Sequence, residues 1–257
     1  MNVAIIAAAG QGSRIGGERA KQFLELGGIP VIIHTLRRFE ACAAIDETIP
    51  VLPAEETAGF LSLANGFGLR KVSRVVAGSK RRAESVRRGL DIVPEGTEIV
   101  AVHDGVRPFV TPDEIARTVA SARAGGAAVL VGPVTDTIKE IDGVRIVGTP
   151  PRAKLRRALT PQCFRYDILK QAYEHLNRFA EEITDDSTLV EKLGVPITLV
   201  DGDPRNIKIT RPEDFVLAEA LLKQWSVASG QWSVVGCRVA KKGPKGPKTN
   251  WPLTTSH

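Results

Sequence analysis

Short apolar runs alternate with segments of helical periodicity along most of the chain. Six runs are predicted strands: Val3–Ala8, Thr48–Leu52, Val72–Ala77, Ile99–His103, Ala127–Val131 and Ile197–Val200. Val3–Ala8 is continuously apolar, as expected of a strand that is covered on both faces. Because strands and helices follow each other at this period, the pattern predicts an α/β fold. We expect a doubly wound, mostly parallel sheet with helices on both faces.

The helical segments lie between these runs. Pro30 opens one in which Ile32, Leu36 and Phe39 share a face. Thr111-Pro112-Asp113-Glu114 and Thr210-Arg211-Pro212-Glu213 have the sequence of capping boxes, and they predict helices that run to about Ala124 and Trp225. The other predicted helices are Glu55–Asn65, Arg82–Leu90, Tyr166–Phe179 and Ser187–Leu193.

One segment interrupts the alternation. Thr137–Ile141 and Val144–Val147 flank Asp142-Gly143, which predicts a β-hairpin on a type I′ turn. We expect an inserted arm over about residues 134–150. Such an arm is suited to grip a second subunit and form a homodimer; a solvated hairpin without a partner is the alternative.

The composition is that of a soluble globular protein, with 43% hydrophobic and 25% charged residues among 257. No apolar run reaches the roughly 18 residues that a membrane span needs, and the start of the sequence shows no export signal. The cysteines Cys42, Cys163 and Cys237 have no metal or redox spacing. We therefore expect a cytoplasmic protein without a membrane partner.

The net charge of +6 is concentrated at the end of the chain. Residues 229–257 contain five cations and no acid, so residues 1–228 are nearly neutral. This distribution argues against nucleic acid as a partner. We expect one domain over residues 1–228 and a basic, disordered tail over residues 229–257.

The stretch Ala7–Gln22, which reads AAAGQGSRIGGERAKQ, follows the first predicted strand. Its glycines would let backbone N–H groups approach an anion, and Arg14 and Lys21 could neutralise it. The spacing G-x-G-x-x-x-G is one residue too long for a dinucleotide loop, and Glu18-Arg19 stands where a P-loop needs Lys-Ser/Thr. The stretch therefore predicts a nucleotide loop of another kind, with a solvated basic loop as the alternative.

Asp104 directly follows a buried strand. Ligands of doubly wound sheets lie outside the carboxyl ends of the strands, so Asp104 should face the same crevice as the Gly-rich loop. A carboxylate beside a polyphosphate is unfavourable unless a divalent cation lies between them, which makes Asp104 a candidate Mg²⁺ ligand. Capping of the next loop is the alternative role of Asp104. His103 is expected to be a packed histidine.

Polar residues that could bind a ligand also occur late in the chain. Arg152 follows two prolines, and Lys208 stands in the apolar stretch Asn206–Thr210, which has the pattern of a short strand. A lysine there needs a partner, unless it protects an edge strand from aggregation. Thr184 precedes Asp185 and Asp186, either of which could cap a helix and leave Thr184 free to donate to a ligand.

These residues resemble those of the 2-C-methyl-D-erythritol 4-phosphate cytidylyltransferase family. Ala7–Gly12, Arg14 and Ala20-Lys21-Gln22 match its signature loop. Further matching segments follow in the family's order over roughly residues 3–225: His103-Asp104-x-x-Arg107-Pro108, Asp136-Thr137, Thr160-Pro161-Gln162, Ile183-Thr184-Asp185 and Asn206–Asp214.

The resemblance implies a Rossmann-like nucleotidyltransferase that transfers a cytidylyl group from CTP to the polyol phosphate and releases pyrophosphate, in non-mevalonate isoprenoid biosynthesis. It implies that Mg²⁺ assists and that the arm forms a homodimer. The catalytic residues would be Arg14, Lys21, Arg152 and Lys208. The CTP site would contain Ala8, Ala9, Gly10, Gly12, Gly78, Ser85, Asp104 and Gly105, with Asp104 at the metal. The sugar phosphate would meet Arg107, Thr137, Arg152, Thr184 and Lys208, some of them from the neighbouring subunit.

The sequence departs from the family pattern at three places. Ala20 replaces a usual proline, Gly105-Val106 replaces a usual Ala-Ala, and Gly78-Ser79-Lys80 lacks a second glycine and an acid. The last change touches the region that contacts the base. A cytidylyltransferase for another polyol phosphate, such as ribitol 5-phosphate, is the nearest alternative. A non-catalytic nucleotide-binding regulatory module is an alternative of another class; a dehydrogenase domain, also of another class, is disfavoured by the glycine spacing.

Overall fold

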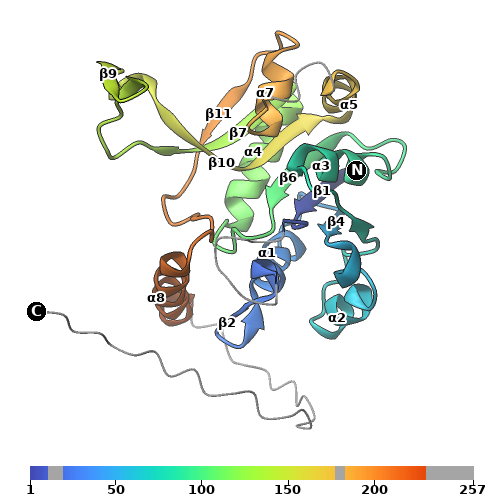
Figure 1. The fold of residues 1–257 in the computed structure, drawn as a ribbon. Coiled ribbons are helices and arrows are strands. Elements are labelled where there is room, and N and C mark those ends of the chain that lie inside the picture. The colour runs from blue at the N-terminus through green and yellow to red at the C-terminus, as the bar shows by residue number, and fades with distance from the viewer. Residues whose placement is uncertain (11–19, 177–182, 230–257) are drawn as a thin grey trace, which may run out of the picture.

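A seven-stranded sheet runs through the centre of the protein in the computed structural model, which describes residues 1–10, 20–176 and 183–229 (Figure 1). The strand order is β11-β7-β10-β6-β1-β4-β5, and every neighbouring pair is parallel except the two pairs that include β10. The strands are β1 (Asn2–Ala7), β4 (Glu47–Leu52), β5 (Val76–Ala77), β6 (Ile99–Asp104), β7 (Ala127–Pro133), β10 (Arg156–Arg165) and β11 (Thr198–Asp201).

Helices cover both faces of the sheet because alternate side chains of the buried strands point to opposite sides. Ala4 and Ile6 pack on one face with α1, α2 and α4, whereas Val3 and Ile5 pack on the other with α3, α5 and α7. This arrangement confirms the predicted doubly wound α/β fold. The helices are α1 (Val31–Glu40), α2 (Phe60–Gly66), α3 (Arg82–Leu90), α4 (Pro112–Gly125), α5 (Tyr166–Glu174) and α7 (Asp186–Glu191).

A third apolar cluster joins the last helix to the sheet edge. Helix α8 (Pro212–Ser229) contributes Ala218, which packs with Leu26 of the small β2–β3 ribbon (Glu25–Leu26 and Ile29–Pro30) and with Phe109. The segment before α8 crosses the end of β6, where Ile209 N donates to Val106 O at 2.9 Å. Residues 205–210 therefore lie against the loop that follows Asp104, without forming the strand expected there.

The chain reverses its direction of winding between β1 and β6. After β1 it adds β4 and β5 on one side, and then crosses to place β6 on the other side. The carboxyl ends of β1 and β6 are in register, with Ala7 opposite Asp104. Ligands of open α/β sheets bind at such a switch point.

Strand β10 was not predicted from the sequence. It lies between β6 and β7, antiparallel to both. Its register shifts between Ala158 and Gln162, where Thr160-Pro161 stands. Proline cannot donate to a strand ladder and normally argues against a central strand, so a bulge is needed to accommodate it.

The predicted arm is present, and it projects away from the sheet (Figure 1). Its strands are β8 (Glu140–Asp142) and β9 (Arg145–Gly148), with Asp142 opposite Arg145. The two turn residues are therefore Gly143 and Val144, one position later than predicted. Gly143 has a φ of 55°, and Val144 is not among residues of positive φ, so the predicted type I′ turn is wrong and glycine occupies the first position of a type II′ turn.

Other boundaries differ for local reasons. The predicted helix Glu55–Asn65 is broken at Gly59, which has a φ of 79°, into a 3-10 turn (Ala54–Glu56) and α2. The predicted strand Val72–Ala77 is paired only at Val72 and over Val76–Ala77.

The capping box at Thr111 and Glu114 is confirmed by bonds in both directions. At the second box the carboxylate that accepts from Thr210 N is that of Asp214, one residue beyond the predicted Glu213. Helix α5 ends at Glu174, short of the predicted Phe179, and α7 starts one residue before the predicted Ser187. The predicted tail from residue 230 onward lies outside the described residues.

Candidate active site

The ends of β1, β5 and β6 approach closely at the switch point. A Cβ added to Gly105 would lie 2.6 Å from the Cβ of Ala8, and one added to Gly78 would overlap that of Ala9. Only glycine fits at either position. Among the described residues, an added Cβ at Gly10 would meet nothing within 4 Å.

Ser85 of α3 is also part of this edge. Its hydroxyl accepts from Ser79 N at 2.9 Å and donates to backbone carbonyls, so it fixes the turn that follows Gly78. The structure thus brings together six of the residues predicted to line the nucleotide, namely Ala8, Ala9, Gly10, Gly78, Ser85 and Gly105. Gly12 and Arg14 lie outside the described residues.

Lys21 is held near the same edge by its neighbour. Lys21 opens a 3-10 turn (Lys21–Phe23), and the buried Gln22 donates from Nε2 to Ala8 O at 2.6 Å. This bond ties the far end of the Gly-rich stretch to the end of β1. Lys21 itself is half-buried.

Asp104 is the centre of a cluster of charges. Its Oδ2 lies 3.0 Å from Arg107 Nε and 3.1 Å from Lys208 Nζ, and its Oδ1 lies 3.4 Å from Arg82 Nε. Burial alone would raise the pKa of this carboxyl, but Arg82, Lys208 and Arg107 outweigh it and hold the pKa far below its usual range. Asp104 is therefore ionised at any physiological pH, and Lys208 has the partner that its position required.

A hydrogen-bond chain fixes the backbone around Asp104. Asp104 N donates to Thr160 Oγ1 at 3.2 Å, and that hydroxyl lies 2.9 Å from His103 Nδ1. His103 Nε2 lies 3.1 Å from Arg107 O, an acceptor, so the proton belongs on Nε2 and Thr160 donates to Nδ1. Burial lowers the pKa of His103 to about 4, which keeps the ring neutral. His103 is the packed histidine that was predicted.

Arg107 and the late segment close the site from the other side. Arg107 Nη1 donates to Asn206 O at 2.9 Å, and Asn206 Nδ2 donates to Thr160 O at 2.9 Å. These bonds join segments that are more than 40 positions apart in the sequence. They keep Arg107 and Lys208 beside the carboxylate of Asp104.

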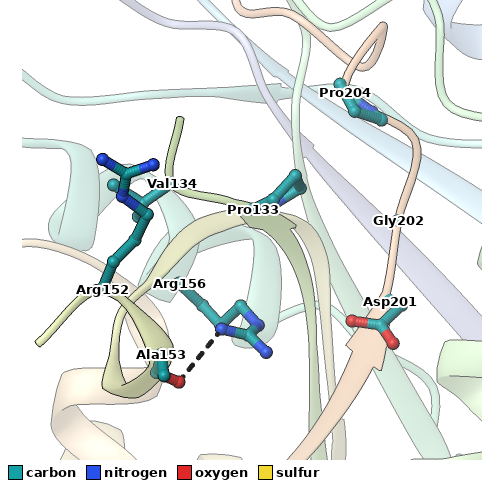
Figure 2. A pocket seen from close by; sticks show the side chains of 8 residues that line it. All are labelled: Pro133, Val134, Arg152, Ala153, Arg156, Asp201, Gly202 and Pro204. Atoms are coloured by element: carbon teal, nitrogen blue, oxygen red, sulfur yellow. Dashed lines mark hydrogen bonds between the residues drawn. The ribbon is translucent and has the colours of Figure 1, made fainter. Parts of the chain in front are cut away.

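Thr137 and Arg152 lie together at the base of the arm. Arg152 Nη2 donates to Thr137 Oγ1 at 3.2 Å. Arg152 also lines a cavity of about 540 Å³ with Arg156 and Asp201, at the carboxyl ends of β7 and β11 (Figure 2). Within the described residues, no hydrogen bond or ion pair joins this pair to the Asp104 cluster.

Thr184 lines a separate cavity of about 210 Å³ together with Arg81, Arg82 and Asp185. Asp185 caps α7 by accepting from Thr188 N, as one of the two predicted alternatives required. The Thr184 hydroxyl lies 3.3 Å from that of Thr188, so the expectation of a free hydroxyl is not met.

Sequence reasoning missed Arg82 and Asp186. Arg82 contacts Asp104, and its Nη2 lies 2.8 Å from Oδ2 of the buried Asp186. A weak sequence signal was available: Arg82 is the first residue of a helix, where the dipole disfavours a cation, and an acidic partner would offset this cost. The sequence does not indicate which acid that is.

The donors at this edge fit a divalent cation only in a limited way. Among the described residues there is no group of three or more His, Cys, Asp or Glu side chains that could hold a metal. Within the part of the chain that the structure describes, the contact to Asp104 Oδ1 is the long one from Arg82. One carboxylate matches the way in which Mg²⁺ is often bound, with water and substrate phosphates completing its shell.

Fold and site together define a class. Glycines at the strand ends of the switch point let a ligand approach the backbone, and three cations surround the carboxylate of Asp104. Both features are typical of an α/β nucleotidyltransferase. In the part of the chain that the structure describes, no helix has the length and apolar character to cross a membrane.

The chain belongs to the 2-C-methyl-D-erythritol 4-phosphate cytidylyltransferase family, whose model matches residues 2–224. A relative of that name from Pelotomaculum thermopropionicum is 44% identical over 86% of this chain and 93% of its own. Another from Geobacter metallireducens is 42% identical over 86% and 97%.

Solved structures agree. The 4-diphosphocytidyl-2C-methyl-D-erythritol synthase of Anaerococcus prevotii has a TM-score of 0.76 at 29% identity, covering 86% of this chain and 95% of that one. The 2-C-methyl-D-erythritol 4-phosphate cytidylyltransferase of Thermus thermophilus has a TM-score of 0.69 at 34% identity, covering 86% and 98%.

Proposed function

We propose that the protein transfers a cytidylyl group from CTP to 2-C-methyl-D-erythritol 4-phosphate and releases pyrophosphate. The observation that carries the proposal is the Asp104 cluster, which lies at the switch point beside Ala7, where the Gly-rich stretch begins. Family membership supplies the identity of the two substrates. The cytoplasmic location expected from the sequence stays a prediction.

The reaction needs no general base. A phosphate oxygen of the polyol phosphate, already ionised at neutral pH, attacks the α-phosphorus of CTP as the bond to the β-phosphate oxygen breaks. Catalysis then consists of aligning two anions and offsetting the charge on the transferring group. Lys21 and Arg14 are proposed to do this on the triphosphate side.

Asp104 is proposed to hold Mg²⁺ together with the triphosphate oxygens. When bound, the ion would offset the negative charge of the triphosphate. Asp104 would remain anionic there because Arg82, Arg107 and Lys208 suppress its protonation. Ala8, Ala9, Gly10, Gly78 and Gly105 would let the nucleotide approach the backbone.

The polyol phosphate is proposed to bind among Arg107, Lys208 and Thr184, with Thr137 and Arg152 from a second subunit. Two observations support a homodimer through the arm. Thr137 and Arg152 lie apart from the Asp104 cluster, and the arm exposes Ile141, Ile146 and Val147 by 60% or more. A second copy covering the arm would bury these side chains.

A pyrophosphate-release assay with CTP, Mg²⁺ and a panel of polyol phosphates tests the proposal. We expect release with 2-C-methyl-D-erythritol 4-phosphate and far less with ribitol 5-phosphate. Preference for ribitol 5-phosphate would reassign the substrate. No release with any alcohol phosphate would refute the enzymatic function.

A further inference from the structure

Arg82 divides its guanidinium between two carboxylates on different elements. Nε contacts Asp104 Oδ1 at the end of β6, and Nη2 contacts Asp186 Oδ2 at the start of α7. The shorter distance is to Asp186, 2.8 Å against 3.4 Å. Asp186 is therefore the nearer of the two carboxylates that hold this guanidinium.

Asp186 is itself fixed from behind. Tyr173 of α5 donates from its hydroxyl to Asp186 Oδ1 at 2.5 Å, and both residues are buried. Asp186 is 1% exposed, so no ligand can reach it. The series of contacts Tyr173–Asp186–Arg82 thus connects a buried tyrosine to the edge of the site.

Arg82 is the member of this chain that a ligand can reach. Its side chain is 30% exposed, and it lines the 210 Å³ cavity with Thr184. Arg107 and Lys208 both contact Asp104 Oδ2, whereas Arg82 contacts Oδ1. The position of Arg82 therefore determines how much positive charge faces the cavity at Thr184.

We propose that Asp186 is a positioning residue for the acceptor substrate: it holds Arg82 between Asp104 and the cavity at Thr184, where Arg82 helps to bind the polyol phosphate. The inference rests on the proposed function. A buried ion pair that serves only folding is the competing role, because removing one partner of such a pair is usually destabilising.

The test is a comparison of two Michaelis constants. Asp186→Asn keeps the size and the contact with Tyr173 but removes the charge that holds Arg82. We expect the KM for the polyol phosphate to rise about 10-fold, as loss of one charge-assisted contact does, and the KM for CTP to change less than about 2-fold. A purely structural role would lower the amount of active enzyme and leave both KM values unchanged.

A double-mutant cycle shows whether Asp186 acts through Arg82. Arg82→Gln should also raise the KM for the polyol phosphate, and Arg82→Gln combined with Asp186→Asn should be no worse than Arg82→Gln alone. Losses that multiply would overturn the proposal.

Arg82→Lys covers the case in which Asp186→Asn does not fold. Lysine keeps the charge but cannot contact both carboxylates with a planar fork. We expect it to behave like Arg82→Gln; a wild-type KM would overturn the proposal.

Glu98→Gln is the matched control. This variant removes another Arg–carboxylate pair, the one between Glu98 and Arg123. The pair is half-exposed and lies at the other end of β6 from Asp104. Both KM values should stay at the wild-type level.

Two outcomes separate this inference from the proposed function. Wild-type enzyme that turns over no polyol phosphate would count against the proposed function. Active wild-type enzyme together with an unchanged KM of Asp186→Asn for the polyol phosphate would count against the positioning role alone.

Discussion

Gly78 and Gly66 are two glycines with ordinary backbone angles and opposite surroundings. A Cβ on Gly78 would overlap Ala9 and lie 2.9 Å from Ser85 Oγ, whereas a Cβ on Gly66 would meet nothing within 4 Å. We expect Gly78→Ala to cost about 1–3 kcal/mol of unfolding free energy and to raise the KM for CTP, because the segments that follow β1 and β5 must move apart.

Gly66→Ala is the control for that prediction. It lies in helix α2, where alanine should stabilise by about 0.5–1 kcal/mol. Denaturant titration and CTP kinetics of both variants provide the measurement. Equal changes in unfolding free energy and in the KM for CTP in the two variants would contradict the close approach at Gly78.

Lys21 is a second residue whose role can be isolated. A cation that stabilises the transferring group acts mainly in the transition state, so Lys21→Ala should lower kcat by about 100-fold with a smaller change in KM. Lys170→Ala, on the exposed face of α5, should leave the kinetics unchanged. Steady-state rates of Lys21→Ala close to wild type would remove Lys21 from the mechanism.

Lys208 should have the opposite kinetic signature. Its ammonium pairs with Asp104 Oδ2 at 3.1 Å and remains partly exposed, so it can also meet an incoming phosphate. We expect Lys208→Ala to raise the KM for the polyol phosphate by about 10-fold and to change kcat less. An unchanged KM with a lowered kcat would place Lys208 on the triphosphate side instead.

At the scale of elements, the arm gives the sharpest prediction. Ile141 and Ile146 face each other across β8 and β9 and are 66% and 65% exposed. If they pack on a second copy, Ile146→Glu should produce a monomer in light scattering and lose most activity, because Thr137 and Arg152 would no longer reach the partner's site.

Val216→Glu is the control for the arm. Val216 is 72% exposed on α8 and does not belong to the hairpin, so this variant should keep the oligomeric state of the wild type. A monomeric wild type would show instead that the arm is a solvated hairpin.

Elements were predictable from sequence where local pattern and tertiary burial agree. The buried parallel strands β1, β6 and β7 are apolar at most positions, and the box at Thr111 and Glu114 determines the start of α4. Strand β10 was missed because Arg156 and Arg157 begin it and Pro161 interrupts it. Its pairing depends on β6 and β7 on either side, which no local pattern encodes.

The same limit applies to the site in the whole molecule. Position after a strand sufficed to place Asp104 at the switch point, because the topology brings strand ends together. Arg82 and Asp186 could not be paired from sequence, since about 100 positions separate them and they meet only because α3 and α7 lie on the same face of the sheet. Long-range ion pairs are recognised only once the fold is known.

Two buried histidines predict how the stability of the whole molecule depends on pH. Burial lowers the pKa of His34 and of His103 from 6.5 to about 4. Between these pH values the unfolded chain binds more protons than the folded one, so stability falls as the pH falls from about 6.5 toward 4. Each histidine should cost about 2 kcal/mol at pH 5 relative to pH 7.

Asp104 affects the stability of the protein only at more acidic pH. Its lowered pKa contributes stability that is present above about pH 4, the usual carboxyl value, and is lost only below it. The loss between pH 7 and pH 5 therefore belongs to the histidines. His34 Nε2 contacts Leu26 O at 2.8 Å. His34→Gln keeps a donor for this carbonyl and removes the titratable imidazole. Urea unfolding of His34→Gln at pH 7 and pH 5 should show a loss about 2 kcal/mol smaller than that of the wild type, and equal losses would contradict a neutral buried His34.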